Sequence, residues 1–271
     1  MGLKALRVSL YKRYRRFIYD RIYYSDKLTG DLRFFNLGIA PIDVASLAAL
    51  NITTEQHQAQ VYLEAVSAFS RNTVRGQPQR LLEISTGLGG GLHILSQCFP
   101  TTQIVGLDYS PAAIRRSKRV VPTATLVVAD AHATSFQESS FPLVVNIESL
   151  HALNALMFLR EMRRILAADG LLVIVDFHRE PAMATREWLG VQARESELEV
   201  IEFRDLTQHG IASARRDGAR RDRFLKRVPF PFKDRANEMT AGEGSDLLRQ
   251  YVSGEKTYFL CVLKKRTFAA C

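Results

Sequence analysis

Cysteine is scarce in this chain, and long apolar runs are missing. The 271 residues contain three cysteines, Cys98, Cys261 and Cys271, and no two of them have the spacing of a metal-binding pair. We therefore expect no metal site and a reducing, cytoplasmic compartment. No apolar run approaches the roughly 20 residues that cross a bilayer, and the N-terminus has no signal-peptide core. We expect no transmembrane segment.

A recognised nucleic-acid-binding module is also missing, although the chain is basic. Its formal net charge is +9, with basic residues concentrated in 4–21 and 215–227. Such clusters bind nucleic acid or anionic lipid, but a solvated helix face has the same composition, and we expect no nucleic-acid partner. Residues 3–24 have the spacing of an amphipathic helix. Three roles stay open for this helix: peripheral membrane contact, contact with a second copy of the chain, and a position over the active site.

Short β-rich runs alternate with helical stretches from residue 80 onward. This alternation predicts an α/β fold, with a Rossmann-like, seven-stranded, mostly parallel sheet and helices on both faces. The predicted strands are residues 81–85, 103–107, 125–128, 142–147, 171–175, 199–203 and 257–264.

The flanking sequence predicts an extension on each side of a core. Residues 1–52 would hold the N-terminal helix and an aromatic segment, 34–38, that covers the site. The core would span 53–206, beginning with a helix over 55–69 that Thr53 or Thr54 caps. Residues 207–254 are polar and basic, with prolines and glycines, and predict a substrate lid before the last strand. Residues 255–271 would supply that strand and a tail.

Residues 81–91, LLEISTGLGGG, are the clearest candidate for a binding loop. A strand, a tight turn and a helix start follow one another, and small residues let a ligand approach the backbone. A glycine cluster alone is also typical of a packing turn. The next predicted strand is followed by Asp108, whose carboxylate can accept both hydroxyls of a ribose, and this favours a nucleotide-type cofactor. Glu83 and Ser85 depart from a dinucleotide loop, and Glu83 suits a cationic amino group.

Polar residues follow the later strands, where ligands bind in an open parallel sheet. Asp130 can accept from an adenine amino group or cap a helix. His151 and Asp176 follow neighbouring strands, so we expect them to meet, with the imidazole removing a proton and the carboxylate holding its tautomer. His132 and His178 lie near the same rim as alternatives.

Four segments carry a resemblance to a known family. Residues 83–91 resemble motif I of the class I S-adenosylmethionine-dependent methyltransferases, and residues 128–131, 146–151 and 164–172 are similar to their later motifs in order and spacing. In 164–172, Ala168-Asp169-Gly170 replaces the usual Pro-Gly-Gly turn. With Ser85, the triple glycine, the aromatic segment and residues 251–258, the chain looks most like the phthiotriol/phenolphthiotriol dimycocerosate methyltransferase group and related natural-product enzymes, over roughly 34–265.

The resemblance implies S-adenosyl-L-methionine as cofactor, and sugar O-methyltransferases carry a His and an Asp at positions matching His151 and Asp176. We assign four residues to the acceptor, Phe34, Phe35, Glu148 and His178. The residues assigned to the cofactor are Gln60, Glu83, Ser85, Thr86, Gly87, Gly89, Asp108, Tyr109, Asp130, Ala131 and Asn146.

The function expected is O-methylation of a small lipophilic secondary metabolite, a polyketide, lipid or terpenoid, with His151 as general base. Two alternatives stay open. One is C-methylation of an alkene or prenyl side chain, which uses the same cofactor loop. The other is a non-catalytic or RNA-binding protein of the same fold.

Overall fold

The computed structural model describes residues 20, 25–30, 32–74, 76–229 and 233–267 of the chain. The amphipathic helix predicted over 3–24 lies outside the described residues except for Asp20, and so does Cys271. Of the other two cysteines, Cys261 is buried and Cys98 half-buried, and both are free thiols. Among the described helices, none has the length and apolar character needed to cross a bilayer.

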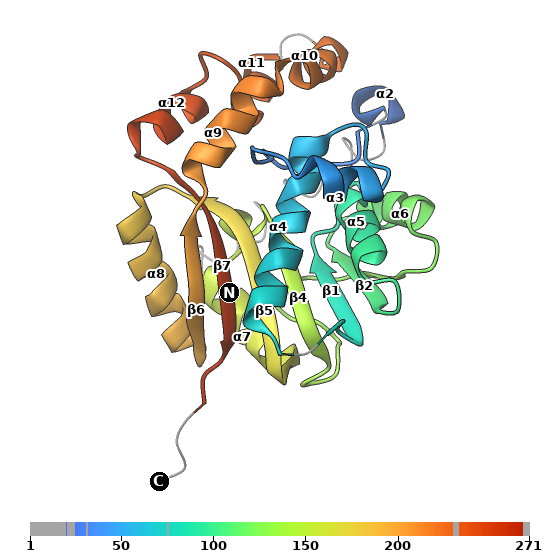
Figure 1. The fold of residues 1–271 in the computed structure, drawn as a ribbon, viewed down its shortest axis with the longest axis vertical. Coiled ribbons are helices and arrows are strands. Elements are labelled where there is room, and N and C mark those ends of the chain that lie inside the picture. Colours follow the sequence, from blue (N-terminus) through green and yellow to red (C-terminus); the bar gives the residue numbers. More distant parts are fainter. Residues whose placement is uncertain (1–19, 21–24, 31, 75, 230–232, 268–271) are drawn as a thin grey trace, which may run out of the picture.

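A seven-stranded sheet lies at the centre of the molecule (Figure 1), in the order β3-β2-β1-β4-β5-β7-β6. Strand β7 pairs antiparallel with both of its neighbours, and the other pairs are parallel. The predicted mostly parallel α/β sheet is therefore confirmed. The strands are β1 Arg80–Ile84, β2 Gln103–Asp108, β3 Thr125–Val128, β4 Phe141–Ile147, β5 Leu166–His178, β6 Leu198–Asp205 and β7 Thr257–Lys265.

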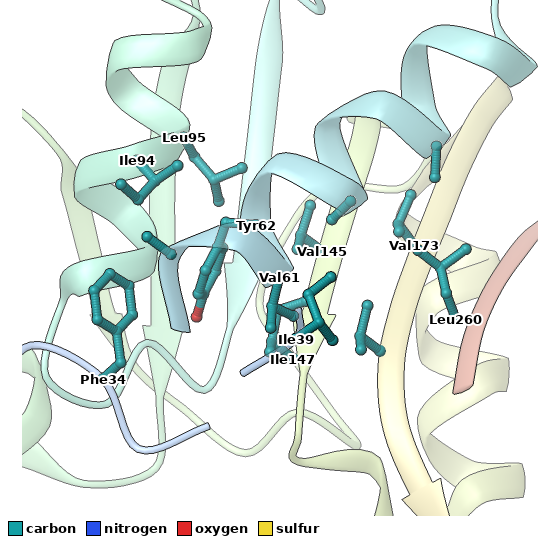
Figure 2. Packing of buried hydrophobic residues seen from close by; sticks show 14 of the residues in the cluster. Phe34, Ile39, Val61, Tyr62, Ile94, Leu95, Val145, Ile147, Val173 and Leu260 are labelled. Atoms are coloured by element: carbon teal, nitrogen blue, oxygen red, sulfur yellow. The ribbon is translucent and has the colours of Figure 1, made fainter. Parts of the chain in front are cut away.

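Helices cover both faces of the sheet because side chains alternate along each strand. Leu81 and Val145 pack in the cluster that contains α4 and α5, whereas Leu82 and Val144 pack in the cluster that contains α7 and α8. Figure 2 shows the first cluster beneath α4, with Tyr62 reaching toward α5. The helices flanking the sheet are α4 Gln56–Asn72, α5 Gly90–Cys98, α6 Pro111–Val120, the 3-10 turn η1 Leu150–Ala152, α7 Ala155–Ile165 and α8 Ala182–Glu195.

Local capping residues start several of these helices. The Ser110 hydroxyl accepts from Ala113 N–H at 3.1 Å, with Pro111 following it, and so begins α6. Asn154 begins α7 in the same way, accepting from Met157 N–H at 3.0 Å. These caps satisfy backbone donors that have no partner within the helix.

The predicted threonine cap of α4 is wrong. The residue before the helix is Glu55, with φ of +51° and no side-chain bond to its own helix. Its carboxylate instead accepts from Arg33 N–H at 2.8 Å and pairs with Arg220 at 3.3 Å. The residue that precedes α4 is therefore held by distant contacts, with Arg33 next to the aromatic segment and with Arg220.

The turn expected at residues 168–170 is part of β5. The partner of Phe141 is Leu166, and the partner of Leu143 is Leu171, so the intervening residues form a bulge. A Cβ on Gly170 would lie 2.7 Å from the Phe141 carbonyl oxygen, which explains why glycine occupies this close approach.

The interval between β6 and β7, predicted as a lid, contains four helices joined by turns in the residues that the structure describes. Its helices gather beyond the carboxyl end of β6, at the top of Figure 1, with the short α2 Asp26–Thr29 and α3 Val44–Ala49 nearby. The helices are α9 Thr207–Arg216, α10 Gly218–Arg227, α11 Lys233–Met239 and α12 Asp246–Ser253.

Replacement of Gly91 tests the junction of β1, α4 and α5. A Cβ there would collide with Glu83 Oε1 and the Tyr62 ring, both packed in the interior. Gly91→Ala is expected to lower the free energy of unfolding by about 1–3 kcal/mol despite the better helix propensity of alanine, measured by urea denaturation. Gly76→Ala is the control, because no atom lies within 4 Å of that Cβ position. Equal stability of the two variants would contradict the described packing.

Candidate functional site

The loop between β1 and α5 turns through three residues with positive φ. Ser85 has φ of +63°, Gly87 of +53° and Gly89 of +84°. Glycine adopts this conformation freely, but serine does so at a cost. The Ser85 N–H is fixed by a 2.7 Å hydrogen bond to the Leu107 carbonyl of β2. The neighbouring strand thus holds Ser85 in a conformation that glycine adopts more easily.

Glu83 lies beneath this loop and is 1% exposed. The Tyr62 hydroxyl donates to its Oε1 at 2.9 Å, while Oε2 is buried without a partner among the described residues. Burial raises the pKa of this carboxyl group to about 8, with Asp108 adding repulsion. A buried carboxylate oxygen that lacks a donor is suited to a cationic amino group.

Asp108 ends β2 and receives two backbone donors. Its Oδ2 accepts from Gly87 N–H at 2.9 Å and its Oδ1 from Ser110 N–H at 2.9 Å. Burial raises its pKa to about 6, to which the nearby Asp20 contributes. Asp20 also accepts a hydrogen bond from the Ser110 hydroxyl. The described part of the N-terminal extension therefore reaches the predicted ribose site.

Asp130 and His132 form a pair after β3. Asp130 Oδ1 lies 2.5 Å from His132 Nδ1, and His132 Nε2 accepts from Asn154 N–H at 3.0 Å. Nδ1 must therefore carry the proton in the neutral ring. His132 thus links β3 to the start of α7 and holds the Asp130 carboxylate, and its catalytic role stays a prediction.

Asn146, at the carboxyl end of β4, is fully buried. Its Nδ2 donates to the Ser149 hydroxyl at 2.5 Å, whereas its Oδ1 has no partner among the described residues. Asn146 and Glu83 thus each hold a buried acceptor oxygen at the carboxyl edge of the two adjacent strands β4 and β1. Both positions were assigned to the cofactor from the sequence, and both have unused hydrogen-bonding capacity.

His151 and Asp176 meet, as their places after β4 and in β5 predict. His151 Nδ1 lies 2.8 Å from Asp176 Oδ1, and Asp176 also accepts from the His151 and Phe177 backbone amides. Asp176 is fully buried, while the His151 side chain is 27% exposed. The imidazole stacks on Phe177 with ring centroids 4.1 Å apart. No described residue hydrogen-bonds His151 Nε2, so this nitrogen faces outward from the pair.

Glu148 connects the aromatic segment to the sheet. Its Oε1 accepts from Leu37 N–H at 2.7 Å and from the Tyr258 hydroxyl at 2.8 Å. Burial raises its pKa to about 7. The backbone at Glu148 has φ of +46°, which turns the chain after β4. The carboxylate assigned to the acceptor thus fastens segment 34–38 over the strand ends.

Three other predicted residues contact neighbouring groups of the protein. Gln60 Oε1 accepts from Asp43 N–H at 2.7 Å. The His178 ring stacks on Trp188 of α8 at 4.3 Å, and burial lowers its pKa. The Phe34 ring packs on Tyr62 with centroids 5.7 Å apart. Phe35, by contrast, is 40% exposed, with its centroid 6.2 Å from that of Phe224 in α10.

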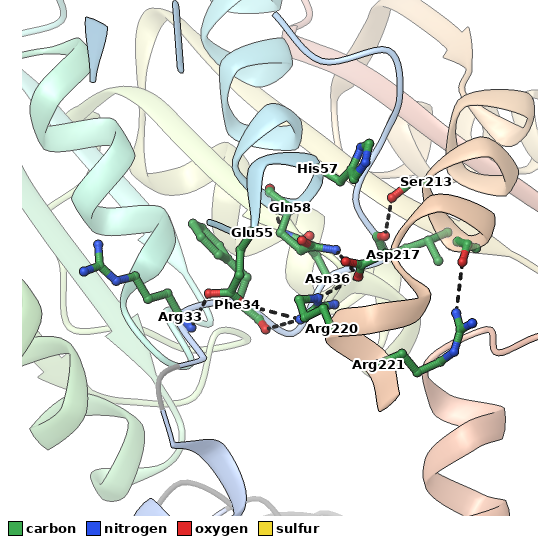
Figure 3. Close-up of polar contacts among 12 residues, drawn as sticks. Arg33, Phe34, Asn36, Glu55, His57, Gln58, Ser213, Asp217, Arg220 and Arg221 are labelled. Carbon is green, nitrogen blue, oxygen red and sulfur yellow. Dashed lines mark hydrogen bonds and ion pairs between the residues drawn. The ribbon is translucent and has the colours of Figure 1, made fainter. Parts of the chain in front are cut away.

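A polar network joins the aromatic segment, the start of α4 and the α9–α10 region (Figure 3). Arg220 pairs with Asp217 at 2.6 Å and with Glu55 at 3.3 Å, and Gln58 donates to Asp217 at 2.9 Å. Asn36 Nδ2 donates to the Gln58 carbonyl at 3.2 Å. This network was not predicted from the sequence, because its members are far apart along the chain and give no local pattern. Gln58 and Asp217, for example, are separated by 159 positions.

Known proteins resemble this chain in sequence and in fold. Residues 82–174 match the family model described as a methyltransferase domain. A phthiotriol/phenolphthiotriol dimycocerosates methyltransferase of Mycobacterium leprae is 29% identical over 257 residues, which cover 92% of this chain and 91% of the relative.

Solved structures share the fold at low identity. An O-methyltransferase from a trans-AT PKS multienzyme of Brevibacillus brevis, in complex with S-adenosyl-L-homocysteine, has a TM-score of 0.60 and 18% identity, covering 84% of this chain and 82% of that one. A geranyl diphosphate C-methyltransferase from Streptomyces coelicolor has a TM-score of 0.63 and 16% identity, covering 92% and 97%. These likenesses show the fold, and with the matched domain they identify S-adenosylmethionine as the cofactor.

The raised pKa of Glu83 predicts a pH-dependent affinity for S-adenosylhomocysteine, which also carries an amino group. Below its pKa of about 8 Glu83 is protonated in the free protein, and an ammonium partner favours the ionised form. Binding must therefore release a proton, and affinity should rise toward pH 8, by up to about tenfold per pH unit. Isothermal titration calorimetry in buffers of different ionisation enthalpy measures both effects.

Glu83→Gln should flatten this dependence above pH 6, and Glu199→Gln, which changes a half-exposed acid paired with Lys264, should leave it intact. An unchanged slope in Glu83→Gln would show that Glu83 does not contact the amino group. Asp108, with a pKa of about 6, contributes only at the acid end of the range.

Proposed function

We propose that this chain, an S-adenosylmethionine-dependent methyltransferase by its domain and fold, methylates a hydroxyl oxygen of a small lipophilic secondary metabolite. Polyketide, lipid and terpenoid alcohols are the acceptor classes. The observation that carries the proposal is the 2.8 Å contact between His151 Nδ1 and the buried Asp176 at the carboxyl edge of the sheet. A base at this edge is what a hydroxyl acceptor requires.

Asp176 positions the base. Three donors converge on its carboxylate, His151 Nδ1 and the amides of His151 and Phe177, so the ion is compensated although it is fully buried. With Nδ1–H held by the carboxylate, the lone pair of the neutral imidazole is on Nε2. Asp176 also stabilises the imidazolium that forms when Nε2 accepts a proton.

Methyl transfer needs an oxygen nucleophile in line with the methyl group and a site without water. When bound, the cofactor supplies a methyl group on a sulfonium. The acceptor oxygen would take the methyl group, with the bond electrons left on the cofactor sulfur, and His151 Nε2 would take the hydroxyl proton. Release of that proton to solvent restores the base.

The cofactor contacts are proposed at the carboxyl ends of β1, β2, β3 and β4. Glu83 and Asn146 would take the amino end, Ser85, Thr86, Gly87 and Gly89 would line the turn, and Asp108 with Tyr109 would hold the ribose. Asp130, oriented by His132, and Ala131 would face the adenine. The buried acceptor oxygens of Glu83 and Asn146 support this arrangement because they lack partners among the described residues.

We infer that the acceptor is lipophilic from the segments that lie over the site. Phe34 and Phe35 belong to the segment that Glu148 fastens over the strand ends, and helices α9–α12, proposed as the lid, follow β6 at the same end. The Mycobacterium leprae relative is named for phthiotriol and phenolphthiotriol dimycocerosates, which are lipids. Residues 1–52 and 207–254 would thus enclose an apolar acceptor over a cofactor-binding core.

Substitution of the pair tests the proposed base. His151→Ala and Asp176→Asn should each lower turnover of a labelled-cofactor assay by about 10²–10⁴-fold, because proton removal is lost or misdirected. Affinity for S-adenosylhomocysteine should stay near that of the wild type. His178→Ala is the matched histidine control, and it should retain turnover because that ring packs on Trp188.

Unaffected turnover in both His151→Ala and Asp176→Asn would remove the proposed base. Binding of S-adenosylhomocysteine with no transfer to polyketide, lipid or terpenoid alcohols would count against this acceptor class. Salt-sensitive RNA binding without turnover would favour the non-catalytic alternative.

A further inference from the structure

A small hollow lies between α10, the residues that follow α2 and the start of α4, and basic side chains line it. Three of them, Arg220, Arg223 and Arg227, come from α10. Their spacing of three and four positions places them on one face of this helix. None of the described residues that line the hollow belongs to the cofactor loop or to the pair of His151 and Asp176. The function proposed above therefore leaves this hollow without a role.

Contacts within the protein hold two of these arginines in place. Arg220 pairs with the Glu55 carboxylate at 3.3 Å (Figure 3), and its side chain is only 15% exposed. Arg227 donates to the Thr29 carbonyl oxygen at 3.3 Å. A Cβ on Gly30 would collide with the Arg227 guanidinium, so this group packs closely over the end of α2. Arg220 and Arg227 are thus fixed parts of the wall.

Arg223 lies between these two arginines along the helix and has no such anchor. It is exposed, and no described residue forms a hydrogen bond or ion pair with its guanidinium. Like charges three and four positions apart on a helix repel one another. Thr54 also lines the hollow, and its hydroxyl makes no hydrogen bond among the described residues and does not cap α4. Two unused donor groups therefore line the same hollow.

The described acids nearby do not compensate Arg223. Glu55, which lines the hollow, accepts from the Arg33 amide at 2.8 Å and pairs with Arg220. Asp217 pairs with Arg220 at 2.6 Å. Asp222 is two positions from Arg220 and therefore on the opposite side of α10. An anion from outside the described residues would offset the positive charge of Arg223.

We propose that this hollow binds a phosphate group, with Arg223 and Thr54 as its free donors and Arg220 and Arg227 as its fixed positive wall. Guanidinium groups match phosphate oxygens with paired N–H donors, and a hydroxyl supplies one further donor. The negative charge of phosphate offsets the repulsion among the arginines. The hollow has a volume of about 30 Å³, enough for the oxygen atoms of one phosphate group and too little for a strand of nucleic acid.

The group bound here is free phosphate or the phosphate headgroup of a lipid, since both present the same oxygens. Apolar side chains beside the arginines favour the lipid. Leu32 and Phe224 line the hollow, and Phe35, which is 40% exposed, lies with its ring centroid 6.2 Å from that of Phe224. A phosphate in this position ties α10 of the proposed lid to α2 and to the start of α4.

Isothermal titration calorimetry of the full chain with inorganic phosphate tests the site, with sodium chloride added to keep the ionic strength constant. The wild type should bind with a Kd of about 1 mM or lower. Arg223→Gln should weaken binding at least about tenfold, because a charged donor is lost. Arg223→Lys should recover part of the affinity, and Thr54→Val should lower it by about threefold or more.

Cosedimentation with vesicles separates the two sources of phosphate. Phosphatidylcholine vesicles that contain phosphatidic acid, whose phosphate is a monoester, should bind the wild type more tightly than vesicles of phosphatidylcholine alone. Arg223→Gln should lose this difference. Dependence on Arg223 in the phosphate titration, in the vesicle assay or in both supports the site, and the assay that shows it identifies the source.

Arg216→Gln is the matched control, because it removes the same charge from an exposed position in α9 outside the hollow. It should retain both kinds of binding. Arg223→Gln should unfold at the same urea concentration as the wild type, since the residue is exposed and unpaired. Equal loss in Arg216→Gln and Arg223→Gln, or no binding of either probe to the wild type, would overturn the inference. These assays measure no methyl transfer, so their failure is separate from a failure of the proposed function.

Discussion

Four acids at one edge of the parallel sheet, three of them buried and Glu148 partly buried, are the constraint on which the rest of the structure depends. Parallel strands bring their carboxyl ends to the same edge, and strands β1, β2, β4 and β5 each place a carboxylate there. Every one of these groups requires donors, because an uncompensated buried charge is strongly unfavourable. The acids are Glu83, Asp108, Glu148 and Asp176.

The hydrogen-bond donors to these acids come mainly from the segments that surround the site. The Tyr62 hydroxyl of α4 donates to Glu83, and the amides of Gly87 and Ser110 donate to Asp108. The Leu37 amide and the Tyr258 hydroxyl donate to Glu148. His151, in η1, pairs with Asp176. The four acids differ in whether every oxygen has a donor, and this difference sets their proposed roles. Glu83, with an oxygen left over, suits the cofactor amino group, whereas the fully satisfied Asp176 suits the permanent orientation of a base.

Periodicity and spacing predicted the parts that depend on local sequence. The seven strands follow from short apolar runs, the turn at Gly87 and Gly89 from its residue types, and the meeting of His151 with Asp176 from neighbouring strands in a parallel sheet. Contacts between segments that are distant in the sequence could not be predicted. Glu148 binds Leu37, 111 positions away, and Glu55 forms a bond to Arg33 that displaces the predicted threonine cap. His178 stacks on Trp188 because alternation along β5 places it, like Asp176 two residues earlier, on the α8 side of the sheet, a contact between segments that no local pattern indicates.

Mass spectrometry with fragment localisation of the labelled methyl group in the product measures directly whether this edge of the sheet delivers a methyl group to oxygen. The label should be found on an acceptor oxygen, with an unmodified carbon skeleton. A label bonded to carbon would contradict O-methylation and the role proposed for His151.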